Sequence, residues 1–266
     1  MTVITTDIRD QISALADWWE AAGVTLDHRE IDRLIKAANT EQKAAPSTVT
    51  PLRGANRGIA EAEALARGAQ DLDALRDALA RFDGCELKET ASKTVFADGI
   101  ADADIMVIGE GPGRDEDRVG KPFVGRAGQL LDRMLASIGL SRETNAYITN
   151  VNFWRPPGNR NPTDEELALC RPFVDRHIAL VQPKLIIATG AVPAKALLGV
   201  PDGIMKLRGK TYQLTVEGLD SDIPVFPIFH PAYLLRRPVE KARAWSDLLN
   251  ILAFMESRNI GPDRPN

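Results

Sequence analysis

A carboxylate with catalytic potential, Glu110, stands in the motif GEGPG at residues 109–113. Three glycines within five residues allow the backbone to approach a ligand closely. The motif is not a Walker loop, because no Gly-Lys-Ser/Thr follows, and Pro112 departs from a dinucleotide-binding fingerprint. Considered alone, the same residues are equally compatible with a tight strand-to-helix turn that has a solvated acidic face.

Three more side chains with binding chemistry follow Glu110 along the chain. Phe123 lies in a loop bounded by proline and glycine, where it is either a core residue or a ring that stacks on a planar ligand. Asn150 ends an apolar run, and its carboxamide suits the edge of a pyrimidine, although asparagine is also a common turn former. His230 follows the last apolar run; a lone histidine is more often structural, but this one is expected at a sheet edge.

A stiff cationic segment, RPPGNRNP, occupies residues 155–162. The next residues, Thr163 to Glu166, match a helix capping box. A rigid loop with two arginines beside a helix N-terminus is suited to contact a phosphodiester backbone.

The elements that must position these residues alternate between strand and helix. Apolar runs of strand length are followed by segments of helical periodicity. This alternation predicts an α/β fold with a four-stranded parallel sheet between helices, and ligands in such sheets bind beyond the carboxyl ends of the strands. The expected strands are 105–108, 146–151, 185–189 and 225–229, and the expected helices are 127–138, 164–181, 192–198 and 239–255.

The chain divides into an expected N-terminal helical extension and linker (1–58), a main domain (59–258) and a tail (259–266). We expect one helix at 7–22 in the extension and one at 59–82 at the start of the main domain. No apolar stretch has membrane length and no signal peptide is visible, so we expect a cytoplasmic protein without membrane contact.

Charge is distributed unevenly along the chain. The net charge of −4 excludes a globally basic nucleic-acid binder. Residues 1–84 contain 10 basic and 14 acidic residues, whereas residues 85–266 contain 23 of each. Basic residues of the neutral part gather in acid-free runs, such as 155–160, and local patches of this kind still attract phosphate.

Together and in this order, the motifs GEGPGRDED, KPFVG, TNV, RPPGNRNP and HPAYLLR resemble family 4 of the uracil-DNA glycosylase superfamily over roughly residues 85–255. The resemblance implies a DNA repair enzyme that flips uracil out of DNA and hydrolyses its N-glycosidic bond with an activated water. The implied partner is uracil-containing DNA, and the products are free uracil and abasic DNA. We expect a monomer.

The resemblance also implies roles for individual residues. Glu110 would orient or activate the attacking water, Phe123 would stack on uracil, Asn150 would read its edge, and His230 would hydrogen bond a pyrimidine carbonyl. Further residues are implied at the uracil site (Gly111), at DNA contacts (Arg155, Asn159, Arg160, Leu234, Leu235 and Arg236) and near the site in an additional role (Glu116). Leu234 and Leu235 would belong to the loop that wedges into the duplex.

The cysteines depart from the family pattern. The resemblance implies four cysteines that hold a [4Fe–4S] cluster, but only Cys85 and Cys170 are present. Lys88 and Trp154 occupy the positions of the other two, and a cationic lysine is not a substitute iron ligand. We therefore expect no cluster and no other metal, with Trp154 filling part of the vacated volume.

Two other functions remain as alternatives. One is a catalytically weak or inactive protein of the same fold that binds uracil or abasic DNA. The presence of Glu110, Asn150 and His230 together argues against it. The other is a nucleotide-binding enzyme that uses residues 109–113 as a phosphate loop, but no ribose-binding acid or phosphate-binding lysine is convincingly placed.

Overall fold

The structure is a computed structural model that describes residues 55–261. The expected helix at 7–22 and most of the expected extension at 1–58 lie outside the described residues. Within residues 55–261, every helix is too short or too polar to cross a membrane.

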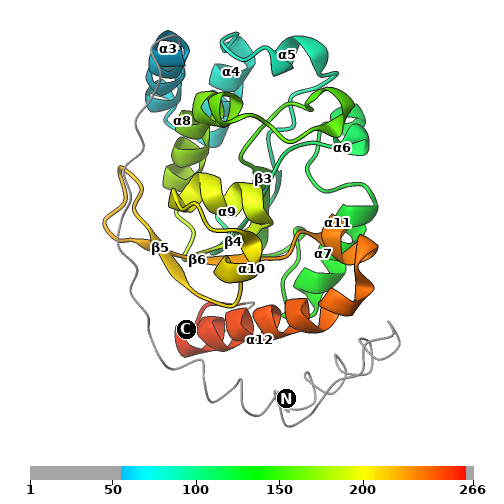
Figure 1. Ribbon diagram of the computed structural model, residues 1–266. Coiled ribbons are helices and arrows are strands. Elements are labelled where there is room, and N and C mark those ends of the chain that lie inside the picture. Colours follow the sequence, from blue (N-terminus) through cyan, green and yellow to red (C-terminus); the bar gives the residue numbers. More distant parts are fainter. Residues whose placement is uncertain (1–54, 262–266) are drawn as a thin grey trace.

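Six strands form one mixed sheet in the order β1-β3-β2-β4-β6-β5. Figure 1 labels four of them, β3, β4, β6 and β5. The four inner strands are parallel to one another, which confirms the expected sheet. Every residue of the first three of them is buried, as expected for strands covered on both faces. The inner strands are β2 (Ile105–Gly109), β3 (Ala146–Asn150), β4 (Leu185–Thr189) and β6 (Ile223–Ile228).

Two antiparallel edge strands go beyond the four expected. β1 (Asp98–Gly99) pairs with β3, and β5 (Tyr212–Leu214) pairs with β6. At two and three residues they are too short to show a period-two pattern, which is why the sequence predicts a smaller sheet. Both give the parallel sheet short outer edges, which limits edge-to-edge pairing with other chains.

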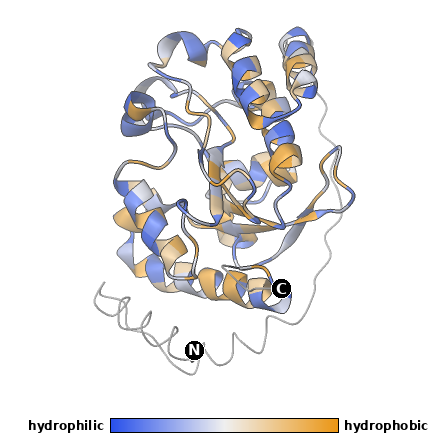
Figure 2. Cartoon of the chain, turned by 180° about the vertical axis from the view of Figure 1, so that it is seen from behind, coloured by the Kyte–Doolittle hydropathy of each residue, from blue (hydrophilic) through white to orange (hydrophobic). Residues whose placement is uncertain are grey.

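Helices cover both faces of the sheet, and alternate strand residues point into the two layers. Met106 and Ile108 belong to one buried cluster and Ile105 and Val107 to the other. Hydrophobic residues accordingly fill the strands and the helix sides that face them (Figure 2). The first layer contains α3 (Ala55–Gly68), α4 (Leu72–Arg81), α8 (Asp164–Val181) and α9 (Ala191–Leu198), and the second contains α7 (Arg126–Ala136), α11 (Pro231–Arg236) and α12 (Lys241–Ser257).

Short helices connect these elements near the sheet edges. They are α5 (Leu87–Thr90), α6 (Arg114–Val119), α10 (Ile204–Leu207) and the 3-10 turns η1 (Pro157–Asn159) and η2 (Pro238–Glu240). The expected capping box is present at the start of α8, where Thr163 and Glu166 bond each other's backbone N–H groups. This reciprocal cap explains why the bounds of α8 agree with the expected helix.

The single helix expected at 59–82 is wrong. The chain breaks there into α3 and α4, and the side chain of Asp71 accepts a hydrogen bond of 2.7 Å from the N–H of Ala74 to cap α4. The apolar period continues across the break, so periodicity alone does not reveal it. The cap residue after Gly68 is the signal that marks the second helix.

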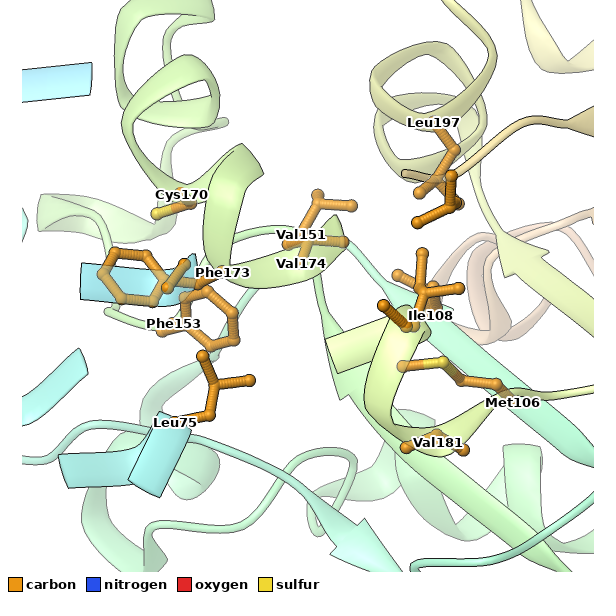
Figure 3. Close-up of a cluster of buried hydrophobic side chains, with 14 of the residues drawn as sticks. Leu75, Met106, Ile108, Val151, Phe153, Cys170, Phe173, Val174, Val181 and Leu197 are labelled. Atoms are coloured by element: carbon orange, nitrogen blue, oxygen red, sulfur yellow. The ribbon is translucent and has the colours of Figure 1, made fainter. Parts of the chain in front are cut away.

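Trp154 lies in the core between these helices and the sheet. Its side chain is 1% exposed, its ring centroid is 6.5 Å from that of Phe82, and its indole N–H donates to Thr94 Oγ1 at 3.0 Å. Figure 3 shows Phe153 and Phe173 in the same layer beside α8. The hydrogen-bonded indole therefore fills this corner without leaving a buried donor unpaired.

Replacing Trp154 with alanine removes the largest of the fully buried side chains in residues 55–261. We expect Trp154→Ala to lower the free energy of unfolding by about 3–5 kcal/mol, because the site cannot collapse fully around the cavity. Urea denaturation measures the loss. The control is Met205→Ala, at a side chain that is 55% exposed, which should change stability by no more than about 0.5 kcal/mol. Equal stability of the two variants would contradict the packing described.

Candidate active site

The register of β2 and β3 brings the first two motifs together. Gly109 pairs with Asn150, and hydrogen bonds continue past the strand ends, from Val151 N to Gly109 O at 2.9 Å and from Asn152 N to Glu110 O at 3.1 Å. Because the strands are parallel, their last residues share one edge of the sheet. GEGPG and TNV therefore form adjacent walls at the carboxyl edge, where ligands of such sheets bind.

Glu110 follows the last residue of β2 and is half-buried. Burial raises the pKa of its carboxyl group, because removal from water disfavours the charged form. A carboxylate with a raised pKa is a better proton acceptor than one in water. The position and the electrostatics of Glu110 are thus suited to a general base.

The amide of Asn150 is buried and incompletely bonded. The residue is 1% exposed, and its Nδ2 has no hydrogen-bond partner among the described residues. Such a buried unpaired donor costs about 1–3 kcal/mol and calls for an explanation. A ligand carbonyl that enters the site would supply the missing acceptor.

Gly109 controls how closely the ring and the amide approach each other. A Cβ atom at this position would lie 2.4 Å from Asn150 Oδ1 and 2.5 Å from Phe123 Cζ. Neither distance is compatible with a side chain. The strand-end glycine therefore allows the Asn150 amide and the Phe123 ring to meet over the backbone of β2.

Phe123 is held in an uncommon backbone conformation. Its φ is 53°, in the left-handed region, and its side chain is 7% exposed. Glu116 on α6 accepts hydrogen bonds from the N–H groups of Val124 and Gly125, both at 2.9 Å to Oε1. Glu116 is thus near the site, as expected, and one of its oxygens secures the loop that carries the ring.

His230 supplies a neutral N–H donor to the site. Its Nδ1 accepts a hydrogen bond from Ala232 N at 3.1 Å, so the proton of the neutral ring resides on Nε2. Burial, helped by the charge of Arg236, lowers the pKa of His230 to about 4. The imidazole and the Phe123 ring lie 5.8 Å apart between centroids, with 31° between their planes.

Two supporting residues were not singled out from the sequence as site residues. Gly190 follows β4 with φ of 109°, and a Cβ atom there would lie 3.2 Å from His230 Cβ. Asn152 donates from Nδ2 to Trp154 O at 2.7 Å, and a Cβ atom on Gly111 would lie 3.1 Å from that Nδ2. Their signal in the sequence is only their place just after a strand.

The cationic loop is partly occupied by contacts within the chain. Arg155 Nε donates to Asn159 Oδ1 at 2.7 Å. Arg160 makes a two-pronged ion pair with Glu166, at 2.8 and 2.6 Å, and this pair lowers the pKa of Glu166. Asn159 and Arg160 are exposed, whereas Arg155 and Glu166 are half-buried, so the loop presents part of its polar groups at the surface.

The expected wedge loop is only partly at the surface. Leu234 is fully buried in the core between α11 and the sheet, and its expected contact with DNA stays a prediction. Leu235 is 38% exposed, and Arg236 is exposed as well. On this short helix only one leucine of the pair points outward, because neighbouring positions on a helix face different sides.

The residues at the four family cysteine positions, Cys85, Lys88, Trp154 and Cys170, do not fit an iron–sulfur cluster. Cys85 and Cys170 are both buried, and a hydrogen bond with Cys170 lowers the pKa of the Cys85 thiol. The Lys88 ammonium instead donates to Phe82 O at 3.0 Å and to Asp83 Oδ1 at 2.6 Å, just past the end of α4. Within residues 55–261, no group of three or more His, Cys, Asp or Glu side chains could hold a metal ion.

A separate hollow of about 660 Å³ lies between α4 and β1. It contains none of Glu110, Phe123, Asn150 and His230. Four of the charged side chains along it form ion pairs, Asp98 with Lys121 at 2.9 Å and Arg76 with Asp73 at 2.7 Å. The hollow is therefore distinct from the candidate site at the carboxyl edge.

A half-buried carboxylate, a buried ring, an unpaired amide and a neutral imidazole converge at one edge of a parallel sheet. This combination is typical of α/β enzymes that bind a planar heterocycle with a hydrogen-bonding edge.

Comparison with known proteins identifies the family within that class. Residues 96–249, which include all four of these residues, match the uracil DNA glycosylase superfamily. Type-4 uracil-DNA glycosylases are similar to the chain: that of Archaeoglobus fulgidus is 42% identical over 171 residues (63% of this chain and 84% of the relative), and that of Pyrobaculum aerophilum is 36% identical over 198 residues (73% and 100%). The Thermotoga maritima enzyme is 38% identical over 173 residues (65% and 87%). The chain belongs to the uracil-DNA glycosylase superfamily, which confirms the expected family and fold class.

The protonation state of His230 can be measured directly. We expect NMR titration of the imidazole to give a pKa of about 4 and an Nε2–H tautomer at neutral pH, because burial and Arg236 oppose the charged form. Stability linked to this group is present above the unfolded pKa near 6.5 and is lost as the pH falls towards 4. A His230→Gln variant assigns the signal. A pKa near 6.5 or a proton on Nδ1 would contradict the geometry.

Proposed function

We propose that this chain removes uracil from DNA by flipping the nucleotide into the site and hydrolysing the N-glycosidic bond with water, which leaves an abasic site and free uracil. The family to which the chain belongs supports the expected enzyme class, a uracil-DNA glycosylase of DNA repair. The single observation that best supports uracil binding is the unpaired Nδ2 of Asn150 beside the Phe123 ring.

Asn150 and Phe123 together suit the recognition of a flipped pyrimidine. The amide offers an N–H donor and a C=O acceptor side by side, which complements a carbonyl next to a ring N–H in uracil. Cytosine presents the reverse pattern on the same two positions, a donor next to an acceptor, and is disfavoured. Stacking on the Phe123 ring offsets the few kcal/mol lost when the base leaves the duplex.

Glu110 and His230 suit the bond-breaking step. When the bond between C1′ and the base nitrogen breaks, its electron pair leaves with uracil, so the sugar becomes cationic and the base anionic. The Nε2–H of His230 donates to the developing oxyanion of the base, and the Glu110 carboxylate stabilises the cationic sugar. Water then bonds to C1′ and releases its proton to Glu110.

Polar groups of the 155–160 loop and of α11 suit contact with the DNA backbone. Arg155, Asn159, Arg160 and Arg236 provide donors for phosphate oxygens, and Leu235 provides an apolar side chain that can enter the space left by the flipped base. Arg160 would exchange some of its contact with Glu166 for phosphate. We propose that a single copy of the chain suffices, since all of these groups come from one chain.

We also propose that the enzyme works without a [4Fe–4S] cluster. The support is chemical: two thiols are too few to anchor the cluster, Lys88 is bonded to oxygen atoms near the end of α4, and Trp154 occupies the position of the other missing cysteine.

Excision is tested with a uracil-containing oligonucleotide followed by alkali. We expect strand scission at uracil, and about a 100-fold slower reaction for Asn150→Ala because a buried donor at the transition state is lost. Stability should fall little, since the variant also removes an unpaired buried amide. The matched control is Asn152→Ala, at an amide bonded to Trp154 O, which should lower stability instead.

The same assay separates the alternatives. Binding of uracil-containing DNA without scission would indicate a non-catalytic reader of uracil. Borohydride trapping of a covalent protein–DNA adduct would indicate an amine nucleophile and contradict hydrolysis by water.

Iron content tests the cofactor proposal. Protein purified without oxygen should contain neither stoichiometric iron nor sulfide and should be active. The double variant Lys88→Cys with Trp154→Cys restores four cysteines at the family positions and serves as the control for cluster insertion. Stoichiometric iron in the unmodified chain would overturn the proposal.

A further inference from the structure

We propose that Arg142 is a positioning residue for the reaction: its guanidinium fixes the backbone of Phe123, and this preforms the surface on which the base stacks. The inference rests on the proposed function, because it assigns a role within the same site. Arg142 itself lies in the connection between α7 and β3, outside every motif that suggested chemistry in the sequence.

Arg142 bonds directly to the peptide carbonyls of the loop. Its Nη1 donates to Pro122 O at 2.9 Å, and its Nη2 donates to Phe123 O at 2.8 Å. The side chain is only 15% exposed. Hydrogen bonds from a charged donor in such a partly buried place are stronger than those between neutral groups.

Two carboxylates fix the orientation of the guanidinium. Asp132 on α7 accepts from Nε at 2.9 Å and from Nη2 at 2.8 Å, and Asp98 on β1 accepts from Nη1 at 3.1 Å. With the two carbonyls, these contacts number five, the full donor capacity of an arginine. Lysine has three donors on one atom and cannot reproduce this planar set.

The Phe123 peptide needs such support because its conformation is strained. A non-glycine residue keeps a left-handed backbone conformation only when several surrounding contacts hold it there. Glu116 holds the N–H groups that follow the residue, whereas Arg142 holds its carbonyl. A Cβ atom on Gly128 would lie 1.9 Å from that carbonyl oxygen, so α7 also receives it at close range.

The consequence for binding follows from the position of the ring. In this backbone conformation the Phe123 ring lies near Asn150 and 5.8 Å from the His230 ring, and a loop that relaxes to a right-handed conformation would present the ring elsewhere. The fraction of molecules competent to bind uracil would then fall, and apparent affinity for the flipped base would fall with it.

The test compares Arg142→Lys with Lys121→Met, a control at a residue that pairs with the same Asp98 but is not bonded to the loop carbonyls. We expect Arg142→Lys to lower kcat/KM for uracil-containing DNA about 10- to 100-fold, because small misplacements of binding groups have effects of this size. Binding to undamaged DNA should stay unchanged, which a general loss of folding would not allow. Lys121→Met should retain kcat/KM within about twofold, consistent with the small contribution of exposed ion pairs.

Backbone coupling constants of Phe123 provide a readout that does not need activity. We expect a positive φ in the unmodified chain and in Lys121→Met, and a shift towards negative φ in Arg142→Lys. An unchanged φ or an unchanged kcat/KM in Arg142→Lys would overturn the inference. If the unmodified chain does not excise uracil, the proposed function fails, and the φ measurement still decides whether Arg142 positions the ring.

Discussion

Gly109 has no side chain, and this allows the Asn150 amide and the Phe123 ring to lie close together at the site. A methyl group at this position would clash with Asn150 Oδ1 at 2.4 Å and with two atoms of the Phe123 ring at 2.5 Å. Parallel pairing of Gly109 with Asn150 brings the two strand ends into line, and the glycine then lets the ring close over them. The binding surface thus depends both on the register of β2 and β3 and on the absence of a side chain at Gly109.

The site keeps polar groups in states that a folded protein otherwise avoids. Asn150 retains a buried donor without a partner, Phe123 has a left-handed backbone, and Glu110 and His230 have pKa values moved by burial. The unpaired donor of Asn150, the left-handed backbone of Phe123 and the burial of Glu110 lower stability at neutral pH, whereas the burial of His230 lowers it only below about pH 6.5. Such strain is common where a pocket is organised before its ligand arrives.

Sequence patterns identified most of the sheet because its inner strands are continuous apolar runs, and the Thr163 cap gave α8 its correct start. The interpretation of 59–82 as one helix was wrong because the apolar period runs across a break that only the Asp71 cap marks. The types of the site residues were predictable, but their conformations depend on contacts distant in sequence. Neither the φ of Phe123 nor the burial of Leu234 is encoded in a local pattern.

Trp154 and Lys88 stand where two cluster-binding cysteines are expected. The Trp154 ring is buried in the core, and the Lys88 ammonium bonds oxygen atoms of Phe82 and Asp83. Metal-dependent domains must acquire their ion before they reach final packing, and chelators unfold many of them. Here the indole and the ammonium complete this region as soon as the polypeptide folds. If the enzyme works without a cluster, as proposed, correct packing of the domain does not depend on how much iron the cell can obtain.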